Sequence, residues 1–271
     1  DDVREEFKHR TIDNAEAGLN ELPNNWIHGI NPLEEPGVLN YSQWTPPPYK
    51  EHYKNNEIKF DKPIVFISNK FNLEHGQTPY GYFDIKCLND MFSYLTESGY
   101  SVVYKRVTNK EKHFTIDQNE RDSVMVGYHT ISANVEGVGT ITDYDLTKYF
   151  DDVHLFDDIV EKYNKYSYNE VQLKVMANCK GFVTVCGGNS ILSSFFGGTV
   201  ISYVHKGKEL RPNYFGKNSY IQKLSDANVI PIYDVIGVVN DEKVVKEYGH
   251  KINDTGTNNY NELLCQIKKE F

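Results

Sequence analysis

The sequence predicts an α/β protein made of two halves, each with parallel strands, that face a cleft. Residues 64–68 are a short continuous apolar run, which is typical of a strand buried on both faces. Residues 83–98 carry apolar side chains at helical spacing, and Gly99 ends that segment. Residues 100–104 form a second apolar run. A strand, a helix and a strand in this order indicate a parallel pair.

A second α/β series follows in the C-terminal part. Residues 181–186 predict a strand, 187–190 a tight loop and 191–196 a short helix that ends at two glycines. Residues 199–204 predict the next strand. The pattern further favours a strand at 229–232 and helices at 168–178, 221–227, 241–251 and 258–270. The sequence therefore predicts two successive Rossmann-like units.

The remaining segments are less regular. Residues 1–20 read as a charged helix, and 21–57 as an irregular arm whose prolines break regular structure while its aromatic residues pack on the body. A disordered linker is the alternative for that arm. Between the two series, short strands are expected at 124–126 and 137–142, and a charged helix-like segment at 151–166.

These segments divide the chain into three parts. We expect an N-terminal helix and irregular arm at 1–60, an N-terminal Rossmann-like domain at 61–155, and a C-terminal Rossmann-like domain at 156–271. The chain opens with Asp-Asp instead of Met, which is compatible with a piece of a longer protein.

Composition limits the partners. The 271 residues carry 29 Lys and Arg against 38 Asp and Glu, a formal net charge of −9. That balance disfavours nucleic-acid binding, which depends on cations that neutralise phosphates, but it leaves room for a small anion in a local pocket. No apolar run approaches the length of a membrane span and no signal peptide opens the chain, so a cytoplasmic protein is expected.

The four cysteines form no CxxC pair and no zinc-type cluster. We expect buried, reduced thiols in a reducing compartment. Their positions are Cys87, Cys179, Cys186 and Cys265.

The sharpest local signal is the turn Gly187-Gly188-Asn189-Ser190, between the strand at 181–186 and the helix that follows. Glycines let a ligand approach the backbone, and the first turn of a helix favours an anion such as a diphosphate. Asn189 or Ser190 could bind a phosphate oxygen or cap the helix. An ordinary strand–helix turn is the equally weighted alternative. The spacing is not GxGxxG, and the lysine of a P-loop is missing.

A charged loop follows the next strand. Lys206, Lys208 and Arg211 could neutralise a diphosphate, and Glu209 could accept hydrogen bonds from ribose hydroxyls. Tyr214 closes this candidate donor loop. A solvated charged loop is the alternative.

The N-terminal series offers further candidates where its strands end. Glu74, His75 and Asp84 are suitable general bases for deprotonating an acceptor hydroxyl, although Asp84 at a helix start also suits a cap. Residues expected to hold an acceptor or an anionic group are Asn69, Lys70 and Arg106.

The pair Asp143 and Asp145 forms a DxD pattern. In one class of sugar transferases such a pair holds a divalent metal, but this pair also resembles a helix start. No metal and no cofactor are expected.

The segment from Tyr168 to Ser190, with Phe196-Gly197-Gly198 and residues 206–210, resembles the donor half of glycosyltransferases with the GT-B architecture. The strand ends Ser68-Asn69-Lys70 and Tyr104-Lys105-Arg106 resemble the acceptor half. The similarity covers about residues 62–235 and points to small viral and microbial glycan-building transferases. It implies that Gly187, Gly188, Asn189 and Ser190 bind the donor diphosphate without a metal, with Glu209 on the ribose or base.

The expected function is therefore transfer of a hexosyl, deoxyhexosyl or pentosyl unit. The donor would be a UDP- or GDP-type nucleotide sugar, and the acceptor a glycan hydroxyl. Two alternatives stay open: a metal-dependent GT-A-type transferase that uses Asp143 and Asp145, and a nucleotide- or glycan-binding module without catalysis. A pyridine-nucleotide oxidoreductase fits less well, because the glycine spacing differs from that of the dinucleotide fingerprint.

Overall fold

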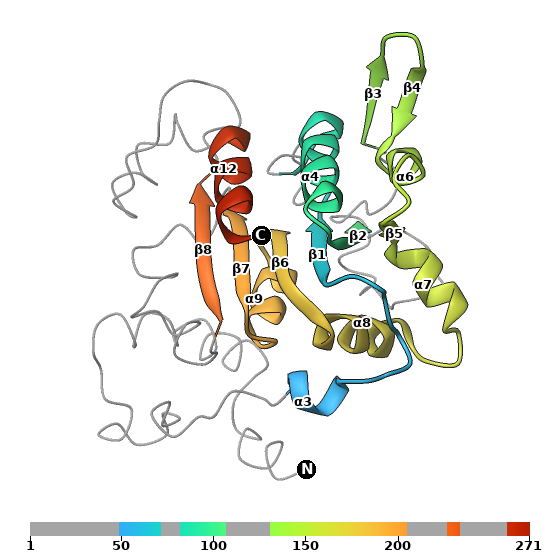
Figure 1. Cartoon of the computed structure of the whole chain (residues 1–271), viewed down its shortest axis with the longest axis vertical. Helices are drawn as coiled ribbons and strands as arrows, with labels where there is room; N and C mark the ends of the chain where they lie inside the picture. The colour runs from blue at the N-terminus through green and yellow to red at the C-terminus, as the bar shows by residue number, and fades with distance from the viewer. Residues whose placement is uncertain (1–48, 72–81, 107–130, 205–226, 234–258) are drawn as a thin grey trace, which may run out of the picture.

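The computed structural model describes residues 49–71, 82–106, 131–204, 227–233 and 259–271 (Figure 1). The strands are β1 (Ile64–Asn69), β2 (Ser101–Arg106), β3 (Ser132–Val135), β4 (Gly139–Thr142), β5 (Val153–Leu155), β6 (Cys179–Val185), β7 (Thr199–Val204) and β8 (Asn228–Tyr233). The helices are α3 (Tyr49–Tyr53), α4 (Ile85–Glu97), α6 (Asp143–Thr147), α7 (Phe156–Lys162), α8 (Tyr168–Ala177), α9 (Gly188–Ser194) and α12 (Tyr260–Glu270).

Six parallel strands form one sheet in the order β5-β2-β1-β6-β7-β8. Counted along the chain, these strands take the order 3-2-1-4-5-6, which is that of a doubly wound Rossmann sheet. β3 and β4 form a separate antiparallel hairpin that projects from the body (Figure 1). From β1 the chain adds β2 and β5 towards one edge of the sheet, and from β6 it adds β7 and β8 towards the other edge.

Helices cover both faces of the sheet. On one face α4 and α12 pack on strand residues such as Val65 and Ile201, and α6 joins the same core cluster. On the other face α7, α8 and α9 pack on strand residues such as Phe66 and Phe182. Both faces of the central strands are buried because their apolar runs are continuous, as the sequence predicts.

The close approach of α12 to the sheet depends on Gly181. A Cβ atom at this position would lie 2.5 Å from the ring of Phe271, which follows α12. The glycine therefore leaves the space in which that ring packs against β6.

The predicted arrangement of two halves facing a cleft is not confirmed. β1, from the first predicted half, pairs with β6, from the second, through residues such as Phe66 opposite Phe182. The described parallel strands of both halves thus belong to one sheet. The predicted domain boundaries remain predictions.

Most predicted elements within the described residues are found with small shifts. The expected helix-like segment at 151–166 differs, because it begins with the short strand β5 before α7. The expected loop at 187–190 is also shorter, since α9 already starts at Gly188. The predicted elements at 1–20, 124–126 and 241–251, most of 221–227, and most of the arm at 21–57 lie outside the described residues.

The described end of the arm packs on the body as predicted. The Tyr49 ring stacks on Phe196 with ring centroids 5.8 Å apart. The side-chain amide of Asn55 donates to the carbonyl of Lys174, and the amide of Asn178 donates to that of Ile58. These contacts fix residues 49–60 to α8.

The four cysteines are free thiols. Cys87 and Cys179 are buried as predicted, and burial raises the pKa of both thiols. The prediction is wrong for Cys265, which is exposed on α12, and Cys186 is half-buried. Within the described parts of the chain, none of the helices has the length and apolar character needed to cross a bilayer.

Candidate functional site

The direction in which successive strands are added to the sheet reverses between β1 and β6. The topological switch point therefore lies at the carboxyl ends of these two strands. Ligands of open α/β sheets bind in the crevice outside the strand ends at such a point. The segments that leave the sheet here are Asn69-Lys70 after β1 and Cys186-Gly187-Gly188 after β6. The fold thus places the predicted glycine turn at the position where ligands bind in this topology.

The two glycines of this turn allow a ligand to approach the backbone closely. Gly187 has φ 131°, a conformation that side chains rarely adopt, and it serves as the N-cap of α9. Gly188 is exposed, and a Cβ atom there would have no neighbour within 4 Å among the described residues. Ser190 is buried and its hydroxyl donates to the Gly187 carbonyl at 2.8 Å, so it neither caps α9 nor faces the open side.

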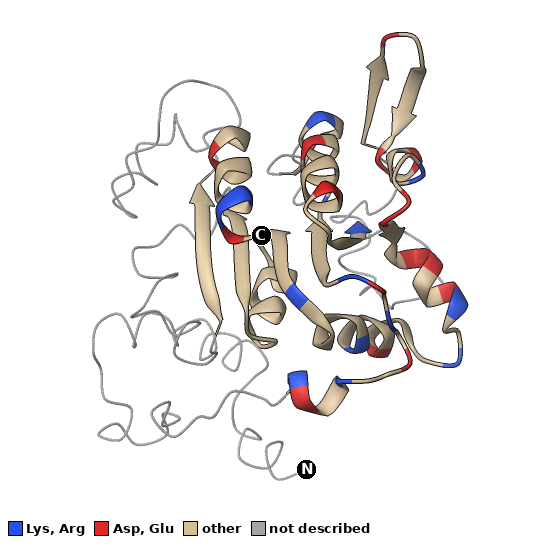
Figure 2. Cartoon of the chain, viewed as in Figure 1, with Lys and Arg blue, Asp and Glu red and all other residues tan. Residues whose placement is uncertain are grey.

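A buried cation lies behind this turn. Among the residues of the six sheet strands, Lys105, Arg106 and Lys180 are the only charged ones, and in Figure 2 the strands are otherwise almost free of charge. Lys105 is 4% exposed, and its ammonium lies 5.3 Å from the Tyr168 ring centroid. Burial lowers the pKa of Lys105 to about 8, against the opposing effect of the Asp157 carboxylate.

Lys105 binds neutral side chains. Its Nζ donates to Gln172 Oε1 at 2.5 Å and to Asn189 Oδ1 at 3.5 Å. Gln172 Nε2 also donates to Asn189 Oδ1, at 3.2 Å. Two donors therefore bind the Asn189 carbonyl oxygen. The amide nitrogen of this half-buried residue carries two further N–H donors.

Three buried hydroxyls continue this row across the sheet. Ser68 is in register with Lys105, Thr184 with Ser68, and Ser202 with Thr184. Each is at most 1% exposed, and none of the three hydroxyls has a hydrogen-bond partner in the described part of the chain. Buried polar groups are normally paired, so such a row next to a buried ammonium is unusual.

Arg106, the next residue on β2, points to the opposite face. Its Nε donates to Asp143 Oδ2 at 2.5 Å and its Nη2 to Oδ1 at 3.1 Å. Tyr104 also donates its hydroxyl to Asp143 Oδ2, at 2.7 Å. All three side chains are buried, so Arg106, which the sequence assigns to an anion, is already paired with a carboxylate.

The other predicted residues near these strand ends have structural contacts. The Asn69 amide donates to the Phe83 carbonyl and accepts from its N–H, each at 2.9 Å, which ties β1 to the start of α4. Asp84 caps α4 by accepting from the Cys87 N–H at 2.8 Å. Lys70 is half-buried directly after β1. Their proposed roles on acceptor, anion and base stay predictions.

Several predicted site residues lie outside the described residues. These are Glu74 and His75 among the candidate bases, and Lys206, Lys208, Glu209, Arg211 and Tyr214 in the candidate donor loop.

The DxD pair is engaged in other contacts. Asp143 is fully buried against Arg106 and Tyr104. Asp145 forms a capping box with Thr142 and an ion pair with Lys148. Three or more carboxylate, thiol or imidazole groups suited to a metal do not gather anywhere in the described ranges. This geometry gives the metal-dependent alternative no support.

Sequence reasoning missed Lys105 and Gln172 as site residues. The sequence does contain one signal for the first: a lysine that ends an otherwise apolar strand is out of place in a buried sheet. Gln172 carries no comparable signal, because only the packing of α8 brings it to Lys105.

No protein-family model and no curated protein matches the chain. Among solved structures, it is similar to the ADP-heptose LPS heptosyltransferase II of E. coli, with a TM-score of 0.38 and 9% identity over 81% of this chain. It is also similar to a glycosyl transferase family 9 structure from Veillonella parvula, with a TM-score of 0.37 and 9% identity over 82% of this chain.

The chain spans about half the length of these two proteins, 52% and 48% respectively. Similarity at this level establishes neither the fold nor the activity of the chain.

Proposed function

We propose that this protein binds a nucleotide-diphosphate sugar at the β1–β6 switch point and transfers its monosaccharide to a glycan hydroxyl without a metal. The carrying observation is Lys105, a buried ammonium with neutral hydrogen-bond partners directly behind the Gly187–Gly188 turn. The reaction class comes from the motif resemblance of residues 168–210. The UDP- or GDP-type donor, the lack of a cofactor and the cytoplasmic location remain expectations.

The charge of Lys105 supports an anionic ligand. Burying an ammonium is costly, and its hydrogen bonds to two amides do not neutralise it. The buried Asp157 carboxylate also acts on Lys105, in the opposite direction to burial. A diphosphate at the turn would add further negative charge on the other side of Asn189, whose amide nitrogen can donate to it. The row of Ser68, Thr184 and Ser202, whose hydroxyls have no partner among the described residues, adds to the polarity of this face.

The same arrangement suits departure of a nucleotide diphosphate. As the sugar–phosphate bond breaks, negative charge grows on the leaving diphosphate, and fixed donors that meet this charge lower the barrier. Here the donors would be the N–H groups of Gly188 and Asn189 and the Asn189 side-chain amide, with the Lys105 ammonium behind it, since the Ser190 N–H already donates to the Gly187 carbonyl. Deprotonation of the acceptor hydroxyl is assigned to Glu74, His75 or Asp84, as predicted from the sequence.

The test replaces Lys105 by Met, which keeps the side-chain length and removes the charge. Thermal shifts are measured with UDP, GDP, CMP and dTDP and the corresponding nucleotide sugars, each with and without EDTA. We expect one base to stabilise the wild type in the presence of EDTA and the shift to disappear in Lys105→Met. Lys180→Met is the matched control, because Lys180 is exposed at the other end of β6.

A second variant addresses the turn itself. Gly188 has room for a side chain and lies outside the positive-φ region, so Gly188→Val leaves the fold intact. Its isopropyl group occupies the place of the diphosphate, and we expect at least a tenfold loss of donor affinity. Unchanged affinity in a folded Gly188→Val protein would remove the turn from the site.

One observation favours a second candidate function. The six parallel strands within the described ranges form a single sheet, whereas the GT-B architecture has two Rossmann-like halves. This favours a nucleotide- or glycan-binding module without catalysis. A protein that binds the donor but releases no nucleoside diphosphate, with or without acceptor glycans, would support that reading over the transferase.

A further inference from the structure

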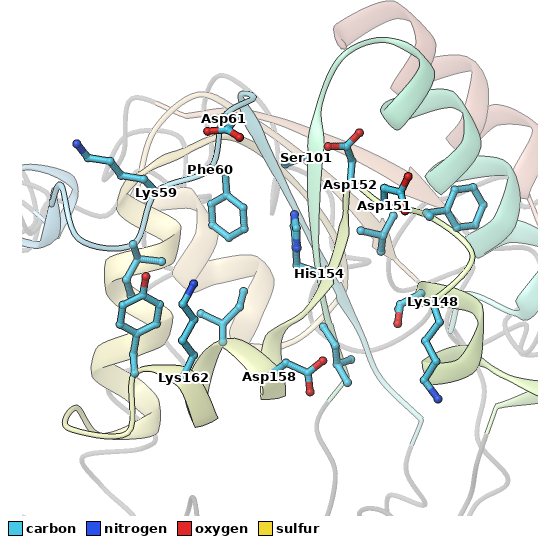
Figure 3. Close-up of a pocket in the computed structure, with 17 residues that line it drawn as sticks. Lys59, Phe60, Asp61, Ser101, Lys148, Asp151, Asp152, His154, Asp158 and Lys162 are labelled. Atoms are coloured by element: carbon cyan, nitrogen blue, oxygen red, sulfur yellow. The ribbon is translucent and has the colours of Figure 1, made fainter.

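A second hollow lies along the edge strand β5, away from the switch point. It has a volume of about 570 Å³, within the range of small-ligand sites. Its wall is formed by the segment before β1, by β5, by the end of α6 and by α7 (Figure 3). No residue of β6, α9 or the glycine turn lines it, so it is distinct from the candidate donor site.

The centre of this pocket is aromatic. The Phe60 ring and the His154 imidazole lie beside each other with centroids 4.8 Å apart and planes at 52° (Figure 3). Tyr163 and Phe150 add two further rings to the wall, and Val153 and Ile159 add apolar surface. Burial lowers the pKa of His154, so the imidazole is neutral at pH 7 and offers one donor and one acceptor.

The rim carries both charges in similar number. Four aspartates and three lysines line the pocket: Asp61, Asp151, Asp152, Asp158, Lys59, Lys148 and Lys162. Asp152 is paired with Lys62 and Lys148 with Asp145, outside the pocket lining. The other three aspartates and two lysines leave no strong excess of either sign. Such a rim does not favour a nucleotide diphosphate, which needs cations.

We propose that this pocket binds a neutral saccharide unit. The apolar C–H face of a sugar ring packs on Phe60 and Tyr163, while its hydroxyls donate to carboxylates such as Asp158 and accept from ammonium groups such as Lys162. The volume accommodates one or two sugar units. Its role as a holding site for the acceptor glycan rests on the proposed function, whereas saccharide binding itself does not.

The experiment uses saturation-transfer difference NMR with the whole chain. The probes are methyl glycosides and disaccharides of neutral hexoses, deoxyhexoses and pentoses, with an acidic and an amino sugar for comparison. We expect transfer to the C–H face of at least one neutral sugar and weaker transfer to the charged ones. No transfer to any neutral sugar at millimolar concentration, or preference for a charged one, overturns the proposal.

Variants locate the binding. Phe60→Ala removes the central ring and is expected to weaken affinity at least tenfold. Since Phe60 also packs on the core, Asp158→Asn serves as a second variant at an exposed position, with an expected several-fold loss. Tyr149→Ala is the matched control, because Tyr149 is a 63% exposed aromatic that does not line the pocket. Equal losses in all three variants would contradict the assignment.

The nucleotide thermal shifts are recorded on the same variants. Loss of saccharide binding with intact nucleotide shifts shows that the pocket is a separate site. A wild type that binds the saccharide but gives no nucleotide shift counts against the donor site alone. The two proposals can therefore fail independently.

Discussion

Lys105 and Arg106 are neighbours on β2, and both are 4% exposed. Their side chains lie on opposite faces of the sheet, and their charged groups have different kinds of partner. Arg106 meets the Asp143 carboxylate in two hydrogen bonds. Lys105 meets two amides and two aromatic rings instead. The arginine charge is neutralised by a hydrogen-bonded carboxylate, whereas the hydrogen bonds of the lysine go to amides and the Asp157 carboxylate acts on it through its charge. Of two buried cations, the one without an ion pair in the described structure is the better candidate for a ligand.

The strongest test of this contrast removes the Arg106 partner. Asp143→Asn leaves a buried guanidinium without its carboxylate, and we expect the free energy of unfolding to fall by about 3–5 kcal/mol. Urea denaturation measures it. Lys86→Ala is the control, because it breaks an exposed ion pair with Asp90 and should leave stability unchanged within error. A small loss in Asp143→Asn would mean that the pair is not structural.

The pH dependence of the free energy of unfolding tests whether Lys105 is buried as an ammonium with a lowered pKa. Its pKa is about 8 in the folded protein and near 10.5 when unfolded, so the unfolded chain binds more protons between these values. The burial penalty is therefore complete below pH 8 and is relieved as the pH rises towards 10.5. The stability difference between wild type and Lys105→Met should change by about 3 kcal/mol across this window.

Urea titrations of both proteins at several pH values measure that difference, and other titrating groups cancel. A stability difference between the two proteins that does not change with pH would contradict the lowered pKa of Lys105. Nucleotide affinity gives the matching readout, since loss of the proton removes the positive charge. It should fall above pH 8 in the wild type, whereas Lys105→Met should show no nucleotide binding at any of these pH values.

A hydroxyl on the Arg106 face should matter for stability. Tyr104→Phe removes the donor to Asp143 and leaves a buried carboxylate with one hydrogen bond fewer. We expect a loss of about 2 kcal/mol in the free energy of unfolding, as for hydrogen bonds to charged groups. Thermal and urea unfolding of the same preparation should agree on this loss. A loss below measurement error would show that Arg106 alone satisfies Asp143.

A hydroxyl on the Lys105 face should behave in the opposite way. Thr184 is buried with no partner for its hydroxyl in the described structure, so Thr184→Val removes an unsatisfied polar group. We expect the free energy of unfolding without ligand to rise by about 1 kcal/mol. Destabilisation would instead indicate that ordered water satisfies this row, and urea unfolding distinguishes the two results.

Part of the site was predictable because its signals are local. The strand before Gly187, the two glycines and the start of α9 lie within a dozen consecutive residues, and backbone preferences decide them. Lys105, Gln172 and Asn189 are separated by 67 and 17 residues, and no local pattern connects them. Their contact depends on α8 packing over β2.

The sequence by itself determined the α/β class, the buried parallel strands and the glycine turn. Continuous apolar runs indicate strands that are buried on both faces, and apolar residues at helical spacing indicate helices with one buried face. Only the tertiary structure decided that β1 pairs with β6. A strand buried on both faces shows the same apolar run whichever neighbour its edge meets. That pairing joins the two predicted halves into one sheet and brings Lys105 behind the turn.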